Sequence, residues 1–204
     1  MIEFLGLFIT LLVTVVIIVF FLRYESEEVS SKNIALISML GTISSVSRVP
    51  FAAIPGIQPC TFIIICTGLV FGPIAGFMVG CLTPLISNFF LGHGPWTLFQ
   101  MLAWGVIGLI AGILGRINSD PDFRMIVVFG AVSGYIFGVI MNVWFWSYFI
   151  YPLTPESFIL SQLSAFGIDT AHAIGTAIFL LLFGRRTILI LERFKKRFMW
   201  GEIS

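Results

Sequence analysis

Charged side chains are scarce in this sequence, and their scarcity excludes large classes of protein. Only 10% of the 204 residues are charged, 11 basic against 10 acidic, whereas 58% are hydrophobic. A water-soluble globular domain carries about 25% charged residues, so the composition excludes a soluble monomer. The net charge of +1 also leaves no basic surface for a nucleic-acid partner.

The chain also lacks the patterns of disulfide, metal and catalytic sites. Cys60, Cys66 and Cys81 all lie inside apolar runs, which predicts neither a disulfide framework nor a metal site. The sequence contains no GxSxG elbow, no HExxH motif and no pair of carboxylates. No Gly-Lys dipeptide is present, so there is no Walker A loop. We therefore expect no enzymatic activity and no cofactor, and any ATP hydrolysis must come from another chain.

Long runs without charge take up most of the sequence, at 4–22, 49–115, 125–155 and 157–168. A bilayer core of ~30 Å needs about 20 apolar residues per helix, so these runs predict an all-α polytopic membrane bundle. Breaks in the runs, including Gly72-Pro73, predict helices at 4–22, 33–47, 59–71, 74–91, 96–115, 125–149 and 158–184. The first run follows Glu3 rather than a basic segment, which favours a membrane helix over a signal peptide.

The basic residues predict the orientation of these seven spans. When the tail that contains Arg185, Arg186, Arg193, Lys195, Lys196 and Arg197 is placed in the cytoplasm, alternation puts every other basic residue except Arg48 on the same side. This asymmetry is what the positive-inside rule requires. We expect a multi-pass plasma-membrane protein with its N-terminus outside and its C-terminus in the cytoplasm.

Arg48 is the exception, and an unusual segment follows it. Residues 49–59 read VPFAAIPGIQP, with three prolines and few polar groups. Apolar irregular backbone near a membrane is tolerated where protein or a cavity satisfies it. The segment is therefore predicted to fold over or into the bundle as a lid; the alternative is an ordinary outer loop with a stray arginine.

Glycines and polar residues recur at helical spacing within the predicted spans. Glycines four residues apart, as at 68, 72, 76 and 80 or at 108 and 112, predict closely packed helices. On the last span, Gln162, Asp169 and His172 share one face. By the predicted topology most intramembrane polar groups lie near Arg48, which indicates a cavity with aromatic walls for an organic ligand.

The candidate ligand-binding residues are Arg48, Gln58, Asn88, Trp96, Gln100, Trp104, Asn142, Trp146, Gln162, Asp169 and His172. Two other interpretations stay open at this stage. Trp96 could belong to an interfacial aromatic belt, and Asp169 could form an internal polar pair with His172.

Several segments resemble the substrate-binding S components of energy-coupling factor (ECF) transporters. They are a small-residue helix that contains Ser38, Gly41, Thr42 and Ser45, the stretch RVPFAAIPGIQPCTF at 48–62, the turn FGPIAGFMVG at 71–80, and SNFFLGHGPWTLFQMLAWGVIGLIAG at 87–112. The resemblance covers about residues 32–184. The 87–112 block is most similar to the branch associated with cobalamin and its precursors.

The resemblance implies an S-component-like core of six helices at 32–184, an extra N-terminal transmembrane helix and linker at 1–31, and a basic cytoplasmic tail at 185–204. It implies capture of a vitamin or vitamin precursor, with cobalamin or its precursor as the first expectation. The partners would be membrane lipid, a transmembrane coupling protein, docked on Ser38, Gly41, Thr42 and Ser45, and two ABC ATPases. Alternatives are a stand-alone carrier of a small heteroaromatic compound, an S component for riboflavin or a queuosine-type nucleoside, and an intramembrane enzyme.

Overall fold

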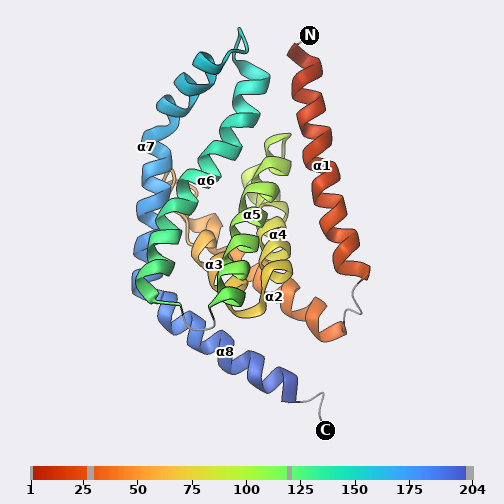
Figure 1. Cartoon of the computed structure of the whole chain (residues 1–204), viewed down its shortest axis with the longest axis vertical. Helices are drawn as coiled ribbons and strands as arrows, with labels where there is room; N and C mark the ends of the chain where they lie inside the picture. The colour runs from red at the N-terminus through yellow and green to blue at the C-terminus, as the bar shows by residue number, and fades with distance from the viewer. Residues whose placement is uncertain (1, 27–29, 119–120, 201–204) are drawn as a thin grey trace.

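The computed structural model describes residues 2–26, 30–118 and 121–200, and these residues form a helical bundle (Figure 1). The helices are α1 (Ile2–Ser26), α2 (Ser31–Arg48), η1 (Val49–Phe51), α3 (Cys60–Phe71), α4 (Pro73–Leu91), α5 (Trp96–Ile117), α6 (Phe123–Phe149), α7 (Pro155–Phe179), η2 (Leu180–Gly184) and α8 (Arg185–Trp200). Parts of the predicted N-terminal linker (27–29) and basic tail (201–204) lie outside the described residues.

Local sequence signals explain where these helices begin and end. Gly72 adopts a φ of 96°, a conformation that glycine reaches without strain, and Pro73 follows at the start of α4. The predicted break between the third and fourth helices is therefore confirmed. Side chains cap three other helices: Ser30 accepts from the Asn33 amide at α2, Asp122 caps α6, and Thr154 caps α7.

The expected polytopic helical bundle is confirmed, but one expected span is too short. In the described ranges, six helices are long and apolar enough to cross a membrane. α3 has 12 residues, which is about 18 Å at 1.5 Å per residue, against a bilayer core of ~30 Å. The helix expected at 59–71 is therefore confirmed as α3, but it is shorter than the six candidate membrane spans.

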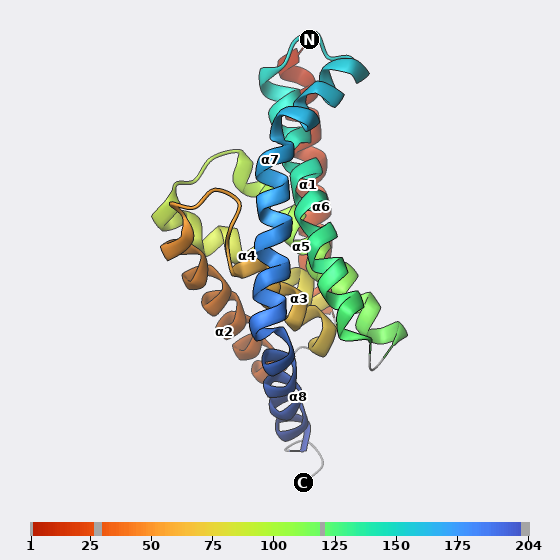
Figure 2. The same cartoon turned by 90° about the vertical axis from the view of Figure 1, so that its left-hand side faces the viewer.

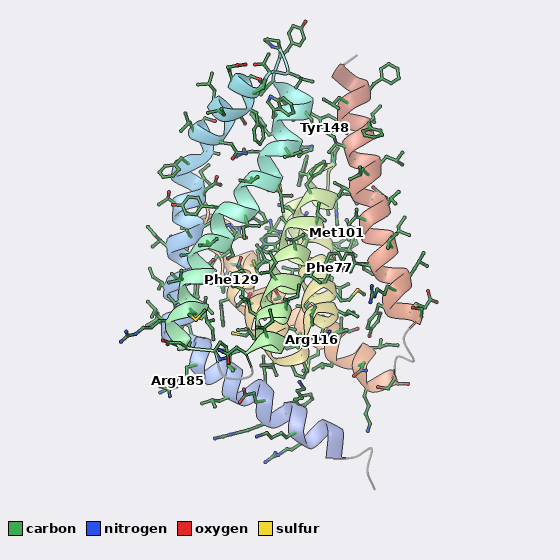
Figure 3. The ribbon with its side chains drawn as sticks, in the orientation of Figure 1. Phe77, Met101, Arg116, Phe129, Tyr148 and Arg185 are labelled. Atoms are coloured by element: carbon green, nitrogen blue, oxygen red, sulfur yellow. The ribbon has the colours of Figure 1, made fainter. Side chains whose placement is uncertain are left out.

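The chain runs up and down between two ends of the bundle. α6 and α7 pair as an antiparallel hairpin, α4 and α5 pack along each other, and α2 and α3 lie against them (Figures 1 and 2). The N-terminus and the α6–α7 link lie at one end, whereas α8 lies at the other. Arg116 and Arg185 both lie toward the α8 end, as the predicted alternation requires (Figure 3).

Glycines set the closest helix crossings, as the spacing predicted. A side-chain carbon at Gly68 or Gly76 would collide with the backbone carbonyl of Gly108, and one at Gly80 would collide with the carbonyl of Trp104. The backbones of α3, α4 and α5 therefore touch along a line of glycines. This contact fixes the rotation of α5 and hence the direction in which Trp104 points.

α1 stands on the outside of the bundle and contacts α4, α5 and α6 (Figures 1 and 3). Phe20 stacks on Phe77 with ring centroids 4.0 Å apart, and the hydroxyls of Thr10 and Tyr148 are 2.9 Å apart. The opposite side of α1 exposes large apolar residues such as Phe8, Leu11 and Val15. α1 is thus a membrane helix attached to one flank, with most of its surface facing lipid.

The basic tail continues the last span as a second helix. α7 ends in a π-helical turn, η2, after which α8 runs across the end of the bundle (Figure 1). Leu191 of α8 is buried, and the Lys195 ammonium donates to the Val70 carbonyl at 2.6 Å. Val70 lies in the last turn of α3, where helix carbonyls lack intrahelical partners, so α8 caps α3.

Candidate ligand-binding site

A cavity of about 280 Å³ lies between the end of α2, the lid, α5, α6 and α7. Its lining combines hydrogen-bonding groups with aromatic and aliphatic walls: Arg48, Gly56, Gln58, Gln100, Trp104, Phe137, Gly138, Met141, Asn142, Ala165, Ile168, Asp169 and His172. Seven of the predicted site residues therefore line one cavity, although they lie on five separate segments.

Arg48 is held at the cavity wall by neutral acceptors. Its side chain is 6% exposed. Nε donates to Oε1 of Gln58 at 2.9 Å, and Nη1 donates to Oγ of Ser87 at 2.7 Å and Oδ1 of Asn88 at 2.8 Å. The guanidinium carbon also lies 4.9 Å from the ring centroid of Trp104. The alternative of a stray arginine in an outer loop is therefore wrong.

Asn88 lies behind the wall and orients its neighbours. While its carbonyl accepts from Arg48, its amide nitrogen donates to Oε1 of Gln100 at 2.9 Å and to Oγ1 of Thr97 at 3.0 Å. The carbonyl of Gln100 is thereby occupied, and its own amide N–H groups are left for the cavity. Asn88 was predicted as a binding residue, but the structure gives it this positioning role.

Thr61 joins two of the predicted residues and was missed by the sequence analysis. Its hydroxyl accepts from the indole N–H of Trp104 at 2.9 Å and lies 2.8 Å from Nε2 of His172. The hydroxyl hydrogen is free to donate to Nε2, which leaves the imidazole proton on Nδ1. α3 is buried on nearly every side, so no polar periodicity marked Thr61 within it.

The lid, residues 49–59, lies against α7. The ring of Phe51 packs edge-on against Phe179 at 5.6 Å. A side-chain carbon at Gly56, where φ is 75°, would collide with the Ile168 carbonyl, and one at Gly175 would lie 3.2 Å from Ile57. Close backbone packing on α7 brings Gly56 and Gln58 into the cavity wall, as the lid interpretation predicted.

Three other predicted residues do not line the cavity. Gln162 accepts from the amide of Asn142 at 2.8 Å and supports it from behind. Trp146 donates to Oγ of Ser157 at 2.8 Å, and Trp96 packs against Trp144 with centroids 5.8 Å apart. Helical spacing placed these residues on the correct face but not at the correct height along the helix.

Asp169 and His172 do not form the internal pair that was considered. His172 bonds to Thr61, whereas Asp169 packs over the backbone of α6, where a side-chain carbon at Gly138 would collide with its carboxylate. Within the described part of the chain, no side chain hydrogen-bonds or forms an ion pair with this carboxylate. The cavity therefore contains an acceptor that this part of the protein leaves open.

The predicted docking face on α2 is divided between two sides of the helix. Ser45 is buried and donates to the carbonyls of Gly41 and Thr83, while Gly41 packs on Leu82 of α4. These two small residues serve packing within the chain, so their assignment to a partner surface is wrong. Ser38 and Thr42 lie on the exposed side.

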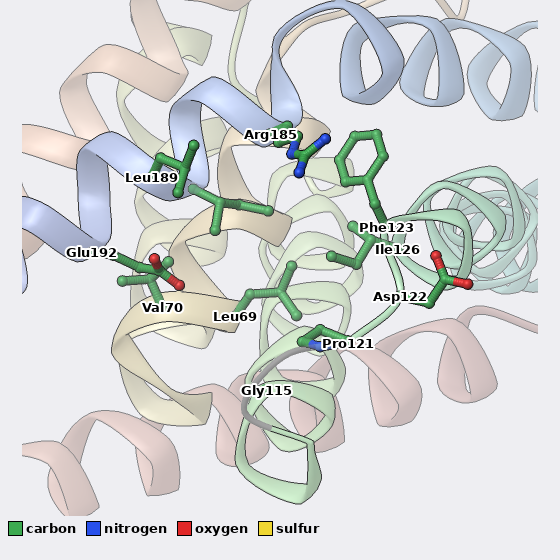
Figure 4. A pocket seen from close by; sticks show the side chains of 11 residues that line it. Leu69, Val70, Gly115, Pro121, Asp122, Phe123, Ile126, Arg185, Leu189 and Glu192 are labelled. Carbon is green, nitrogen blue, oxygen red and sulfur yellow. The ribbon is translucent and has the colours of Figure 1, made fainter.

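A larger hollow of about 450 Å³ lies beneath α8 (Figure 4). Its charged lining residues are Asp122, Arg185 and Glu192, and Asp122 is already used as the α6 cap. Its other walls are mainly aliphatic. The 280 Å³ cavity is the better candidate for ligand binding because polar groups from several helices converge on it.

A membrane bundle with a polar-lined cavity beside a lid is the architecture of a membrane-embedded binding protein. The family model described as ECF transporter, substrate-specific component, matches residues 32–191, and the chain belongs to this family. The matched region begins in α2 and leaves α1 outside.

Curated relatives are similar to part of the chain. A UPF0397 protein of Aliivibrio fischeri (strain MJ11) is 29% identical over 123 residues, 52% of this chain and 67% of the relative. A UPF0397 protein of Vibrio atlanticus (strain LGP32) is 24% identical over 123 residues, 53% of this chain and 66% of the relative. One from Streptococcus pneumoniae serotype 19F (strain G54) is 32% identical over 69 residues, 32% of this chain and 37% of the relative. No solved structure matches the chain.

Proposed function

We propose that this chain, as the substrate-specific component of an ECF importer, captures a small, flat heteroaromatic vitamin or vitamin precursor in the 280 Å³ cavity. The observation that carries this proposal is the convergence of Arg48, Gln58, Gln100, Asn142 and His172 on one cavity. Phe137, which packs on the buried Trp104 with ring centroids 4.5 Å apart, gives the cavity an aromatic wall against which a flat ring can lie.

The volume of the cavity bears on the choice of substrate. Ligand pockets occupy about 300–1,000 Å³, so about 280 Å³ is at the small end. A corrinoid, with its macrocycle and peripheral chains, is several times larger. Cobalamin, the first expectation from the sequence, would need the lid and the α6–α7 hairpin to separate, and a compound of one or two rings fits this conformation better.

The orientation of the bundle in the membrane follows from the distribution of its basic residues. We place the α8 end in the cytoplasm because the basic residues of α8 and Arg116, in the last turn of α5, lie there. The lid and the cavity mouth then face the outside, where a nutrient is captured. ATP-driven uptake would be supplied by a transmembrane coupling protein and two ABC ATPases, with the exposed side of α2 as the docking surface.

The experiment is to purify the protein in detergent and identify by mass spectrometry what remains bound. We expect a stoichiometric small heteroaromatic compound in the wild type. Trp104→Ala combined with Gln100→Ala should lose it, because each lost buried polar contact costs about 1–3 kcal/mol. Thr67→Val, which alters a buried hydroxyl that bonds to the Ile63 carbonyl of its own helix and lies outside the cavity lining, is the control. Unchanged retention by the double variant would remove this cavity from consideration.

A further inference from the structure

We propose that Asp169 selects the substrate by its charge, so that the cavity takes a flat compound with a cationic or N–H-rich group, such as an amidine or an aminopyrimidine. This inference rests on the proposed function of the cavity. Asp169 lines the cavity, and no side chain in the described ranges donates to its carboxylate.

The position of the Asp169 carboxylate depends on a glycine on the neighbouring helix. Gly138 on α6 has no side chain, and the Asp169 carboxylate occupies the space that a side-chain carbon at Gly138 would take. A carboxylate at membrane depth is costly unless a charge or hydrogen-bond donors compensate it. The protein thus maintains an acceptor beside the cavity at a site where an apolar residue would be less costly.

The other polar groups that face the cavity make their hydrogen bonds to groups other than Asp169. Arg48 gives Nε and Nη1 to Gln58, Ser87 and Asn88. His172 bonds to Thr61, and the amide of Asn142 donates to Gln162. In the described structure no ion pair joins Arg48 to Asp169, although both line one cavity. In the described residues the Asp169 carboxylate is therefore open to the N–H donors of a substrate in the cavity.

The chemistry of a carboxylate sets the class of that partner. Two oxygens accept a planar pair of N–H donors in a bidentate arrangement, which is stronger when the donor is charged. The ring that carries these donors would lie against Trp104 and Phe137, which form the aromatic wall. An anionic substituent at the same position would be repelled.

The test uses three probes of one shape and different charge: benzamidine, benzamide and benzoate. Cavities of about 150 Å³ hold a benzene ring, so all three fit the space available. Binding to the purified full chain is measured by calorimetry. We expect benzamidine to bind roughly tenfold more tightly than benzamide, as a charge-assisted hydrogen bond predicts, and benzoate to bind most weakly.

Variants assign this preference to Asp169. Asp169→Asn should reduce the preference to about twofold or less, and Asp169→Glu should keep part of it. Asp122→Asn removes a carboxylate outside the cavity, and asparagine caps a helix equally well, so it should behave as the wild type. Gly138→Ala, which crowds Asp169, should weaken benzamidine binding by a larger factor than benzamide binding, and this comparison holds even if Asp169→Asn folds poorly.

The contrary outcomes separate this inference from the proposed function. Failure of benzamidine to bind the wild type, a preference for benzoate, or an unchanged order in Asp169→Asn would overturn the role of Asp169. Ala165→Phe fills the cavity. If it abolishes binding while Asp169→Asn keeps the order of the three probes, the cavity remains the binding site and only the charge selection is wrong. If Ala165→Phe binds all three as the wild type does, the cavity is not the site.

Discussion

Thr61 shows how much a single hydroxyl can organise in a membrane interior. It bonds to both Trp104 and His172, so removing it leaves two buried polar groups without this partner. Thr61→Val should destabilise the protein by about 1–3 kcal/mol and lower the thermal unfolding midpoint. Thr67→Val is the matched control, because the buried Thr67 hydroxyl bonds only to the Ile63 carbonyl of its own helix. Equal shifts in the two variants would contradict the bridging role.

Arg48 links the lid to the α4 wall through two of its nitrogens. Lysine keeps the charge but lacks the planar fork that reaches Gln58 and Asn88 together. Arg48→Lys should therefore weaken retention of the copurified compound by more than about tenfold and increase hydrogen exchange in residues 49–59. The exposed Arg23→Lys is the control. Unchanged exchange and retention would show that Arg48 does not hold the lid.

The candidate site could be predicted only in part from single residues. Spacing placed Gln100 and Trp104 on one face and Asp169 with His172 on another, and all four line the cavity. Spacing gives the direction of a side chain but not its neighbour on the next helix. Asn88 was therefore not recognised as a support, and the bond between Thr61 and His172 crosses 111 residues of sequence.

At the scale of the elements, the glycine crossing of α4 and α5 can be tested directly. Gly76→Ala places a carbon against the Gly108 carbonyl, and overpacking of this kind costs about 1–3 kcal/mol. We expect a lower thermal unfolding midpoint and less folded protein. Gly167→Ala on α7 is the control, because nothing lies within 4 Å of the added carbon. If both variants unfold alike, close packing at Gly76 does not limit the stability of the bundle.

The order and type of the elements could be read from the sequence because bilayer length and charge constrain them strongly. The Gly72-Pro73 break and the capped start of α7 are local signals and were within reach. The short α3 was counted as a span because its composition is apolar, and composition alone does not show at what depth in the membrane a helix begins. The helix α8 was expected only as a basic tail, since its stability depends on Leu191 and Lys195 contacts with α3.

At the scale of the whole molecule, α1 is separate from the cavity. No residue of α1 lines it, and the family match begins after α1. Deletion of residues 1–29 should therefore leave the copurified compound bound while lowering the unfolding midpoint, because the Phe20–Phe77 stack and the Thr10–Tyr148 contact are lost. Loss of the compound from a folded deletion variant would show that α1 shapes the cavity from a distance.

ATP-driven uptake, as we propose it, needs a surface for partners as well as a cavity, and we expect the exposed side of α2 to serve the partners. Ser38 and Thr42 are exposed one turn apart, whereas Gly41 packs on Leu82. Ser38→Leu with Thr42→Leu should leave the bound compound unchanged and reduce uptake by about tenfold or more in cells that contain the coupling protein and ATPases, because small residues permit close helix approach.

Gly41→Leu is the contrasting variant, and it should lose compound and uptake together. Its first side-chain carbon would lie 3.0 Å from Leu82, so α2 would be displaced from α4 together with Arg48 at its end. Binding and radiolabel uptake, measured in the same cells, separate the two effects. If the Ser38 and Thr42 variant transports normally, docking occurs elsewhere.

The sequence contains no Walker A loop, so the described chain has no such motif to power uptake by ATP hydrolysis. If the wild type nevertheless accumulates the compound in cells without any coupling module, the chain acts as an autonomous carrier.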